Sequence, residues 1–154
     1  MEIATFAAGG FCGVEAASRQ IKGVKSTRVG YTNGNMKNPS YENVCSDETG
    51  HAEAVEVTYD QKKVSYDDLL KVFWQNHDPT QLNRQGPDVG TQYRSAVFYH
   101  NKKQKQAALN SIKEEQKKRK NKIMTEIKKA VEFYQAEDYH QQYLEKRGLS
   151  TCRI

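Results

Sequence analysis

The chain of 154 residues has little cysteine and little proline, with three residues of each, and only one tryptophan. Its cysteines, Cys12, Cys45 and Cys152, form no Cys-x-x-Cys pair, so neither a zinc cluster nor a disulfide scaffold is indicated. The sequence also lacks an apolar run long enough to span a bilayer, and its first residues do not resemble a signal peptide. An odd number of thiols is typical of a reducing compartment, which predicts a cytoplasmic protein.

The length suggests one domain, because a chain of this size can bury a core without disulfide bonds. Charged residues make up 28% of the sequence, but an aromatic content of 10% argues against disorder. We therefore predict a single domain over residues 1–154, with 147–154 as a mobile C-terminal tail. Nothing in the sequence requires more than a monomer.

The formal net charge of +5 comes mainly from a lysine-rich stretch at residues 102–122. A surface that binds nucleic acid or an acidic partner is one interpretation. A solvated helix face is the better supported one, because acidic residues interrupt the run and Ala108, Leu109 and Ile112 form an apolar stripe.

Strands and helices are expected to mix without strict alternation along the chain. Apolar alternation predicts strands at 3–7, 25–32, 53–59, 94–99 and 123–133. Helices are expected at 11–22, after a capping box at Ser65, at 101–121 and at 137–146. Residues 33–50 and 78–91 are predicted to be long polar loops. The order predicts an α+β fold, a two-layer α/β sandwich with a small mixed sheet, a ferredoxin-like core and long loops.

A cysteine lies where the first helix is expected to begin. Cys12 follows Gly9-Gly10, in the first turn, where free N–H groups and the helix dipole favour a thiolate. Cys12 is therefore a candidate reactive thiol. A buried, inert cysteine is the alternative, and the neighbouring residues alone do not decide between the two.

The polar loops contain candidate proton donors and oxygen-binding groups. Glu53 leads a strand expected to be buried, which makes it a candidate acid. The hydroxyls of Tyr41 and Tyr93 can hold a substrate oxygen while they donate hydrogen bonds. Taken one at a time, a structural role is the better interpretation of each tyrosine.

Asp88 follows Pro87 and is by itself best interpreted as a turn residue. His51 and His77 lack the partner spacing of a metal site such as His-Glu-x-x-His, so we expect structural histidines and no bound metal.

Four segments resemble the signature of the peptide methionine sulfoxide reductase A family. They are VCSDETGHAEAV at 44–55, VFWQNHDPTQ at 72–81, GTQYRSA at 90–96 and AEDYHQQYL at 136–144. The likeness runs from about Ile3 to the C-terminus, and several long motifs in the right order argue strongly against a chance match.

The resemblance implies reduction of methionine-S-sulfoxide, free or in proteins, as a repair of oxidative damage. A thiolate attacks the sulfoxide sulfur, an acid protonates the oxygen, methionine leaves and the cysteine becomes a sulfenic acid. Cys152 is then implied as the thiol that forms a disulfide, which thioredoxin or another dithiol reduces. Cys45 matches a family cysteine that is usually accessory. No bound cofactor is implied.

By position, the resemblance places the acid at Glu53 and the hydroxyl donors at Tyr41 and Tyr93. It places Asp88 nearby through hydrogen bonding. The substrate-binding positions that it implies are Gly10, Phe11 and His51.

The chain departs from the family in one short segment. The family's first motif reads Gly-Cys-Phe-Trp-Gly, whereas residues 9–13 read Gly-Gly-Phe-Cys-Gly. The nucleophile position is therefore Gly10, and Cys12 stands where the family has an aromatic pocket wall. A bulky apolar residue is also expected near Ser18, so we predict a gap or an added polar group in the core there.

Three hypotheses follow from these departures. The chain is a reductase that uses a relocated thiol, Cys12; or it binds sulfoxide without turnover; or it is a reductase whose first helix was changed by experiment or design. The clustering of the changes favours relocation or alteration over drift, and reductase with Cys12 as nucleophile is our leading hypothesis. From another class, a binding module based on the helix at 102–122 is the alternative, and steep salt dependence of binding supports it.

Overall fold

The computed structural model describes residues 1–46 and 49–141, apart from the side chains of Phe11 and Cys12. The strands are β1 (Glu2–Ala8), β2 (Val24–Thr32), β3 (Ala52–Tyr59), β4 (Arg84–Gln85), β5 (Asp88–Val89), β6 (Ser95–Tyr99), β7 (Glu126–Lys129) and β8 (Phe133–Gln135). The helices are α1 (Phe11–Arg19), α2 (Tyr41–Cys45), α3 (Tyr66–Gln75) and α4 (Lys102–Gln116), with 3-10 turns η1 (Thr91–Tyr93) and η2 (Asp138–His140).

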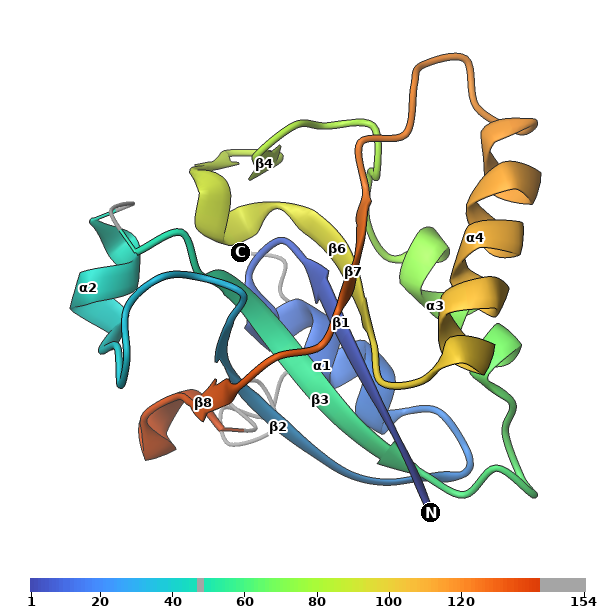
Figure 1. Cartoon of the computed structure of the whole chain (residues 1–154), viewed down its shortest axis with the longest axis horizontal. Coiled ribbons are helices and arrows are strands. Elements are labelled where there is room, and N and C mark those ends of the chain that lie inside the picture. Colours follow the sequence, from blue (N-terminus) through green and yellow to red (C-terminus); the bar gives the residue numbers. More distant parts are fainter. Residues whose placement is uncertain (47–48, 142–154) are drawn as a thin grey trace.

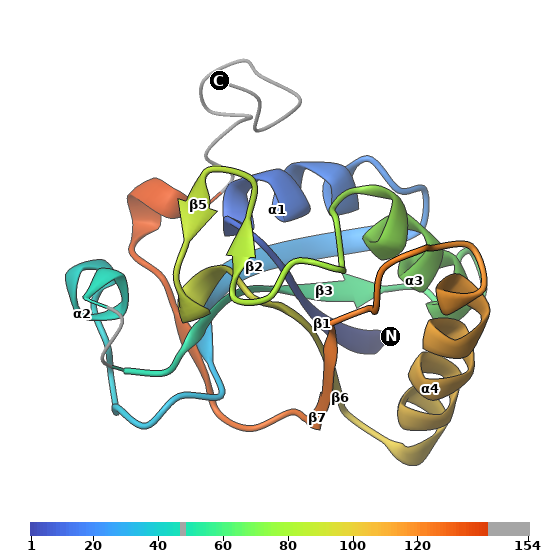
Figure 2. The same ribbon diagram turned by 90° about the horizontal axis from the view of Figure 1, so that it is seen from above.

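Six of these strands form one mixed sheet in the order β7-β6-β1-β3-β2-β8. All neighbours are antiparallel except β6 and β7. Helices α1 and α3 lie on the same side of β3 (Figures 1 and 2). Because side chains alternate along a strand, Phe6, Val55 and Val57 face these helices, whereas Ala7 and Ala54 form a smaller cluster on the opposite face. The mixed α/β architecture agrees with the sequence prediction.

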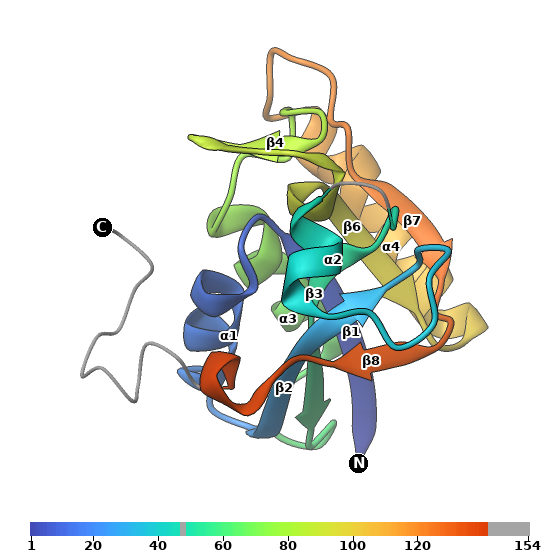
Figure 3. The same cartoon turned by 90° about the vertical axis from the view of Figure 1, so that its left-hand side faces the viewer.

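The sheet is strongly curled, because its two edge strands are joined by a very short segment. Only residues 130–132 separate β7 from β8, and these cross the face of the sheet (Figures 1 and 3). Four residue steps span at most about 14 Å. The edges of a flat six-stranded sheet are about 24 Å apart, at about 4.8 Å per strand. Only a curled sheet brings the two edges within reach.

Local capping signals explain where three of the helices begin. Ser65 and Asp68 form the predicted capping box at the start of α3. Ser40 and Asn43 form a second capping box, which starts α2 inside the region expected to be a loop. Asn101 accepts a hydrogen bond from the backbone of Gln104 at the start of α4.

Other elements differ from the sequence predictions. The strand expected at 123–133 is two strands on opposite edges of the sheet, β7 and β8. The second predicted loop, 78–91, contains the short β4–β5 hairpin and part of η1. Helices α1 and α4 end three and five residues before the predicted ends at 22 and 121. Of the helix expected at 137–146, the described part contains only η2, and the predicted tail at 147–154 lies outside the described residues.

None of the helices in the described part of the chain is both long enough and apolar enough to cross a membrane.

Candidate active site

One end of the sheet gathers the polar residues singled out from the sequence. The antiparallel registers place Phe6 opposite Val55 and Ala8 opposite Ser95, so the end of β1 lies beside the starts of β3 and β6. Glu53 is two residues before Val55 and therefore faces the same side of the sheet as α1. The first turn of α1, the start of β3 and the turn before β6 thus meet at one corner.

Glu53 is buried at this corner, with 3% of its surface exposed. The side-chain amide of Gln92, which is equally buried, donates from Nε2 to Oε2 of Glu53 at 3.2 Å. The same Nε2 lies 3.5 Å from the sulfur of Cys45, an exposed free thiol at the end of α2. A carboxyl group and a thiol are therefore joined through one amide nitrogen.

Two tyrosine hydroxyls are close enough to this carboxyl group to interact with its charge. A hydrogen bond to the Cys45 sulfur, followed by burial and the charge of Glu53, raises the pKa of Tyr41 well above its ordinary value. Burial, then the charges of Glu53 and Asp88, raises the pKa of Tyr93 to about 12. Both hydroxyls therefore remain protonated at neutral pH and can donate hydrogen bonds to a substrate oxygen.

A second layer of hydrogen bonds holds this arrangement in place. Tyr31 lies directly opposite Glu53 in the β2–β3 pair, and its hydroxyl donates to Oε1 of Glu137 at 3.2 Å. The backbone N–H of Tyr41 donates to Oε2 of the same carboxylate at 3.2 Å. Burial raises the pKa of Glu137, but hydrogen bonds from the backbone and from Tyr31 outweigh it and keep the pKa below its ordinary value. The chain near residue 137 therefore anchors α2 to β2.

Sequence reasoning gave no role to three of these residues, Tyr31, Gln92 and Glu137. Two of them lie inside the quoted motifs, at 90–96 and 136–144, where they had no separate signal. Tyr31 had no sequence signal either, because its position opposite Glu53 depends on the β2–β3 register, which only the structure gives.

Gly10 is the N-cap residue of α1, with φ −61° and ψ 135° and no side-chain cap. A Cβ atom built on Gly10 meets no described atom within 4 Å. Residue 10, which the sequence resemblance implies as the nucleophile position, therefore has space for a side chain among the described atoms. Cys12 and Phe11 belong to the first turn of α1, but their side chains, like all of Cys152, lie outside the described residues.

Asp88 is exposed on β5, and its charge helps to raise the pKa of Tyr93. His51 has a different environment. Its Nδ1 accepts from the backbone of Gly34 at 3.0 Å, and its Nε2 lies 2.6 Å from the carbonyl of Met36. Both ring nitrogens therefore bind the backbone of the segment that leads to α2.

His77 is half-buried between α3 and β6. Its ring nitrogens lie 2.7 Å from the carbonyl of Phe73 and 2.7 Å from Oγ of Ser95. Burial lowers the pKa of His77 to about 4, so the ring is neutral at pH 7. These bonds agree with the structural role expected for it. Within residues 1–46 and 49–141, no group of three or more candidate ligands could hold a metal ion.

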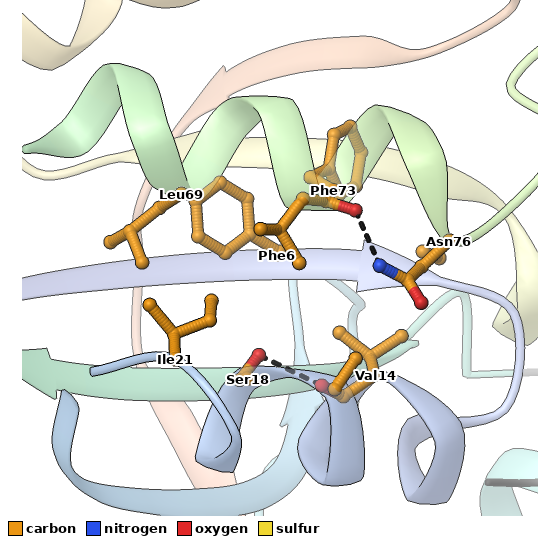
Figure 4. Close-up of a pocket in the computed structure, with 10 residues that line it drawn as sticks. Phe6, Val14, Ser18, Ile21, Leu69, Phe73 and Asn76 are labelled. Carbon is orange, nitrogen blue, oxygen red and sulfur yellow. Dashed lines mark hydrogen bonds between the residues drawn. The ribbon is translucent and has the colours of Figure 1, made fainter.

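Ser18 lines an apolar cavity of about 20 Å³ beneath α1. Its side chain faces Phe6, Leu69 and Phe73 (Figure 4), and its hydroxyl donates to the carbonyl of Val14 at 2.8 Å. The gap expected at this position is therefore present, and the hydroxyl is satisfied within the helix. The cavity lies on the buried side of α1, whereas the Glu53 corner lies at its N-terminal end.

The basic stretch is for the most part a solvated helix face. Ala108 is fully buried against the core, while the lysines of α4 are exposed. Lys117 pairs with Glu114 at 3.1 Å, and Arg119 pairs with Glu115 at 3.0 Å. These pairs offset part of the positive charge.

A family model described as "Peptide methionine sulfoxide reductase" matches residues 2–154. The "Peptide methionine sulfoxide reductase MsrA" of Methanosarcina acetivorans is 62% identical over 150 residues, which cover 96% of this chain and 80% of that protein. Mxr1 of Saccharomyces cerevisiae in its reduced form has a TM-score of 0.91 at 38% identity, over 96% of this chain and 86% of that one. Mxr1 in complex with Trx2 has a TM-score of 0.66 at 27% identity, over 92% of this chain and 84% of that one.

Proposed function

Because the chain belongs to the peptide methionine sulfoxide reductase family and is an oxidoreductase of that kind, we propose that it reduces methionine-S-sulfoxide with Cys12 as the attacking thiol. One observation carries the proposal. A buried carboxyl group, Glu53, and the protonated hydroxyls of Tyr41 and Tyr93 meet at the end of the sheet where α1 begins. Such a cluster can hold and protonate an oxygen atom.

In the first step, the hydroxyls of Tyr41 and Tyr93 donate hydrogen bonds to the sulfoxide oxygen, and Glu53 supplies the proton. The Cys12 thiolate attacks the sulfoxide sulfur. The oxygen leaves methionine and is retained on the cysteine as a sulfenic acid, so methionine is reduced and the thiol is oxidised. The position of Cys12 in the first turn of α1 supports this role, because the free N–H groups of that turn favour a thiolate.

In the second step, Cys152 attacks the sulfenic acid, which releases water and forms a disulfide. A thioredoxin-type dithiol protein then reduces this disulfide. The complex of Mxr1 with Trx2 supports a partner of this kind. The chain itself needs no bound cofactor for this chemistry.

The proposal is tested by single turnover with the S-epimer of methionine sulfoxide and no external reductant. We expect about one methionine per chain, together with a Cys12–Cys152 disulfide in peptide mass maps. Cys12→Ser should abolish methionine formation, whereas Cys45→Ser should retain it. Absence of methionine, with Cys12 still a free thiol, would contradict the proposal and favour sulfoxide binding without turnover.

The setting of the reaction also follows from its chemistry. Thiols that must be reduced between turnovers function best in a reducing compartment, and the free thiol of Cys45 supports a cytoplasmic location. The strand order β6-β1-β3-β2, with α1 and α3 as connections, supports a ferredoxin-like core. We also propose that the enzyme is a monomer. Gel filtration at working concentration tests the monomer.

A further inference from the structure

Gln92 is buried in the site, beside Glu53. It lies in η1, whose ends are fixed by backbone hydrogen bonds from Tyr93 to Gly90 at 3.0 Å and from Arg94 to Thr91 at 3.2 Å. Only 3% of its surface is exposed. A long polar side chain is seldom this deeply buried unless its polar atoms have partners, so the contacts of its amide group bear on function.

The partners of that amide include the acid, a thiol and the side chain of Tyr93. Nε2 of Gln92 lies 3.2 Å from Oε2 of Glu53 and 3.5 Å from the sulfur of Cys45. The carbonyl oxygen of a neutral carboxyl group is a stronger hydrogen-bond acceptor than its hydroxyl oxygen, so the bond from Gln92 favours Oε2 as the carbonyl oxygen. The transferable proton of the acid therefore belongs on Oε1.

We propose that Gln92 is a positioning residue for sulfoxide reduction, which fixes the carboxyl group of Glu53 so that Oε1 presents its proton to the substrate oxygen. The proposal rests on the proposed function for the assignment of Glu53 as the acid. Because the same nitrogen contacts Cys45, Gln92 also keeps α2, and with it Tyr41, against the carboxyl group.

The groups that face Glu53 come from three elements. Tyr31 lies opposite on β2, Tyr41 and Cys45 approach from α2, and Tyr93 approaches from η1. Both Tyr31 and Tyr41 have raised pKa values, by burial first for Tyr31 and by the bond to Cys45 first for Tyr41. None of these groups carries positive charge at neutral pH, and the amide of Gln92 donates a hydrogen bond to the carboxyl group of Glu53.

The test compares Gln92→Met, which keeps the size but removes the donor, with Gln104→Met. Gln104 is also 3% exposed, but it bonds the backbone of Ile3 and His100, outside the site. Carbon-13 NMR of the glutamate carboxyl groups, with Glu53 assigned through Glu53→Gln, gives the titration midpoint of Glu53. Loss of a donor disfavours the ionised form, so Gln92→Met should move this midpoint upward by about one pH unit. Gln104→Met should leave it unchanged.

The same variants are compared in single turnover, in the unmodified chain and in Gly10→Cys. Gln92→Met should slow methionine formation about tenfold and shift the alkaline limb of the pH profile upward. Gln104→Met should lower stability without this shift. An unchanged midpoint and an unchanged alkaline limb in Gln92→Met would overturn the proposal. The NMR midpoint does not need turnover, so a failure of Cys12 as nucleophile is distinguished from a failure of Gln92.

Discussion

Gly9 and Gly10 are neighbours in the turn before α1, but only Gly9 needs to be glycine. Gly9 has φ +86°, and a Cβ on it would lie 2.9 Å from the side chain of Gln85. Gly10 has φ −61°, which every residue adopts, and its Cβ position is open among the described atoms. Nothing in the backbone therefore requires a glycine at residue 10.

Gly10→Cys should be accepted by the fold and should speed sulfoxide reduction. We expect unfolding free energy within about 0.5 kcal/mol of the unmodified chain, since no atom of the described residues must move. We expect methionine formation on the order of a hundredfold faster, because small misplacements of a reacting group have effects of that size. Rapid-quench single turnover measures the rate. The matched Gly9→Ala variant should lose about 1 kcal/mol or more. Equal rates for Gly10→Cys and the unmodified chain would mean that Cys12 is already well placed.

Ser18→Leu should stabilise the protein by about 1 kcal/mol. The added methyl groups enter the apolar cavity beside Phe6 and Phe73, and the substitution removes a hydroxyl that is bonded only to its own helix. Urea unfolding at pH 7 measures the change. A lower midpoint than that of the unmodified chain would show that the walls of the cavity are overpacked by leucine.

His77 should make the fold sensitive to mild acid. Desolvation lowers its pKa to about 4 in the folded chain, against 6.5 when exposed. The unfolded chain therefore takes up this proton first, and stability that is complete above pH 6.5 falls as the pH drops towards 4. A shift of this size corresponds to about 3 kcal/mol. Urea unfolding at pH 7 and pH 4.5 measures the free energy of unfolding at each pH. The difference between the two values should be smaller in His77→Gln than in the unmodified chain. The same substitution at His100, which is exposed, should leave most of the difference in unfolding free energy.

Tyr93→Phe should slow methionine formation about tenfold or more, because it removes one donor to the substrate oxygen. Tyr99→Phe, at the far end of β6, is the control and should have little effect. With a pKa of about 12, Tyr93 stays protonated to about pH 10. The ratio of the rate of the unmodified chain to that of Tyr93→Phe should therefore be constant from pH 7 to 10. The unfolded chain loses this proton near pH 10, so Tyr93→Phe should also reduce the loss of stability above that pH.

Sequence reasoning found those features whose signal is local. The capping box of Ser65 and Asp68 is complete within four residues, and it correctly placed the start of α3. The start of α2 has the same chemistry at Ser40, but with Asn43 in place of an acidic residue and inside a segment rich in turn formers, so the loop prediction prevailed.

Features that depend on distant pairing could not be read from the sequence. The alternation at 123–133 is continuous, but its two halves pair with different edges, β6 and β2. The bond from Gln92 to Glu53 depends in the same way on how η1 meets β3. The resemblance named Glu53 and both tyrosines, but only the packed structure brings them together through a side chain that had no signal of its own.

The three-residue crossing from β7 to β8 also bears on how the chain is made. Thr32 and Glu132, which are hydrogen-bonded beside this crossing, are 100 residues apart in sequence. During synthesis β1, β2 and β3 emerge long before β7 and β8, and pairing over so long a separation is slow. Until it forms, the outer edges of β2 and β6 have no partner strand and can accept one from another chain. The last strands to be made are therefore the ones that protect the sheet from aggregation.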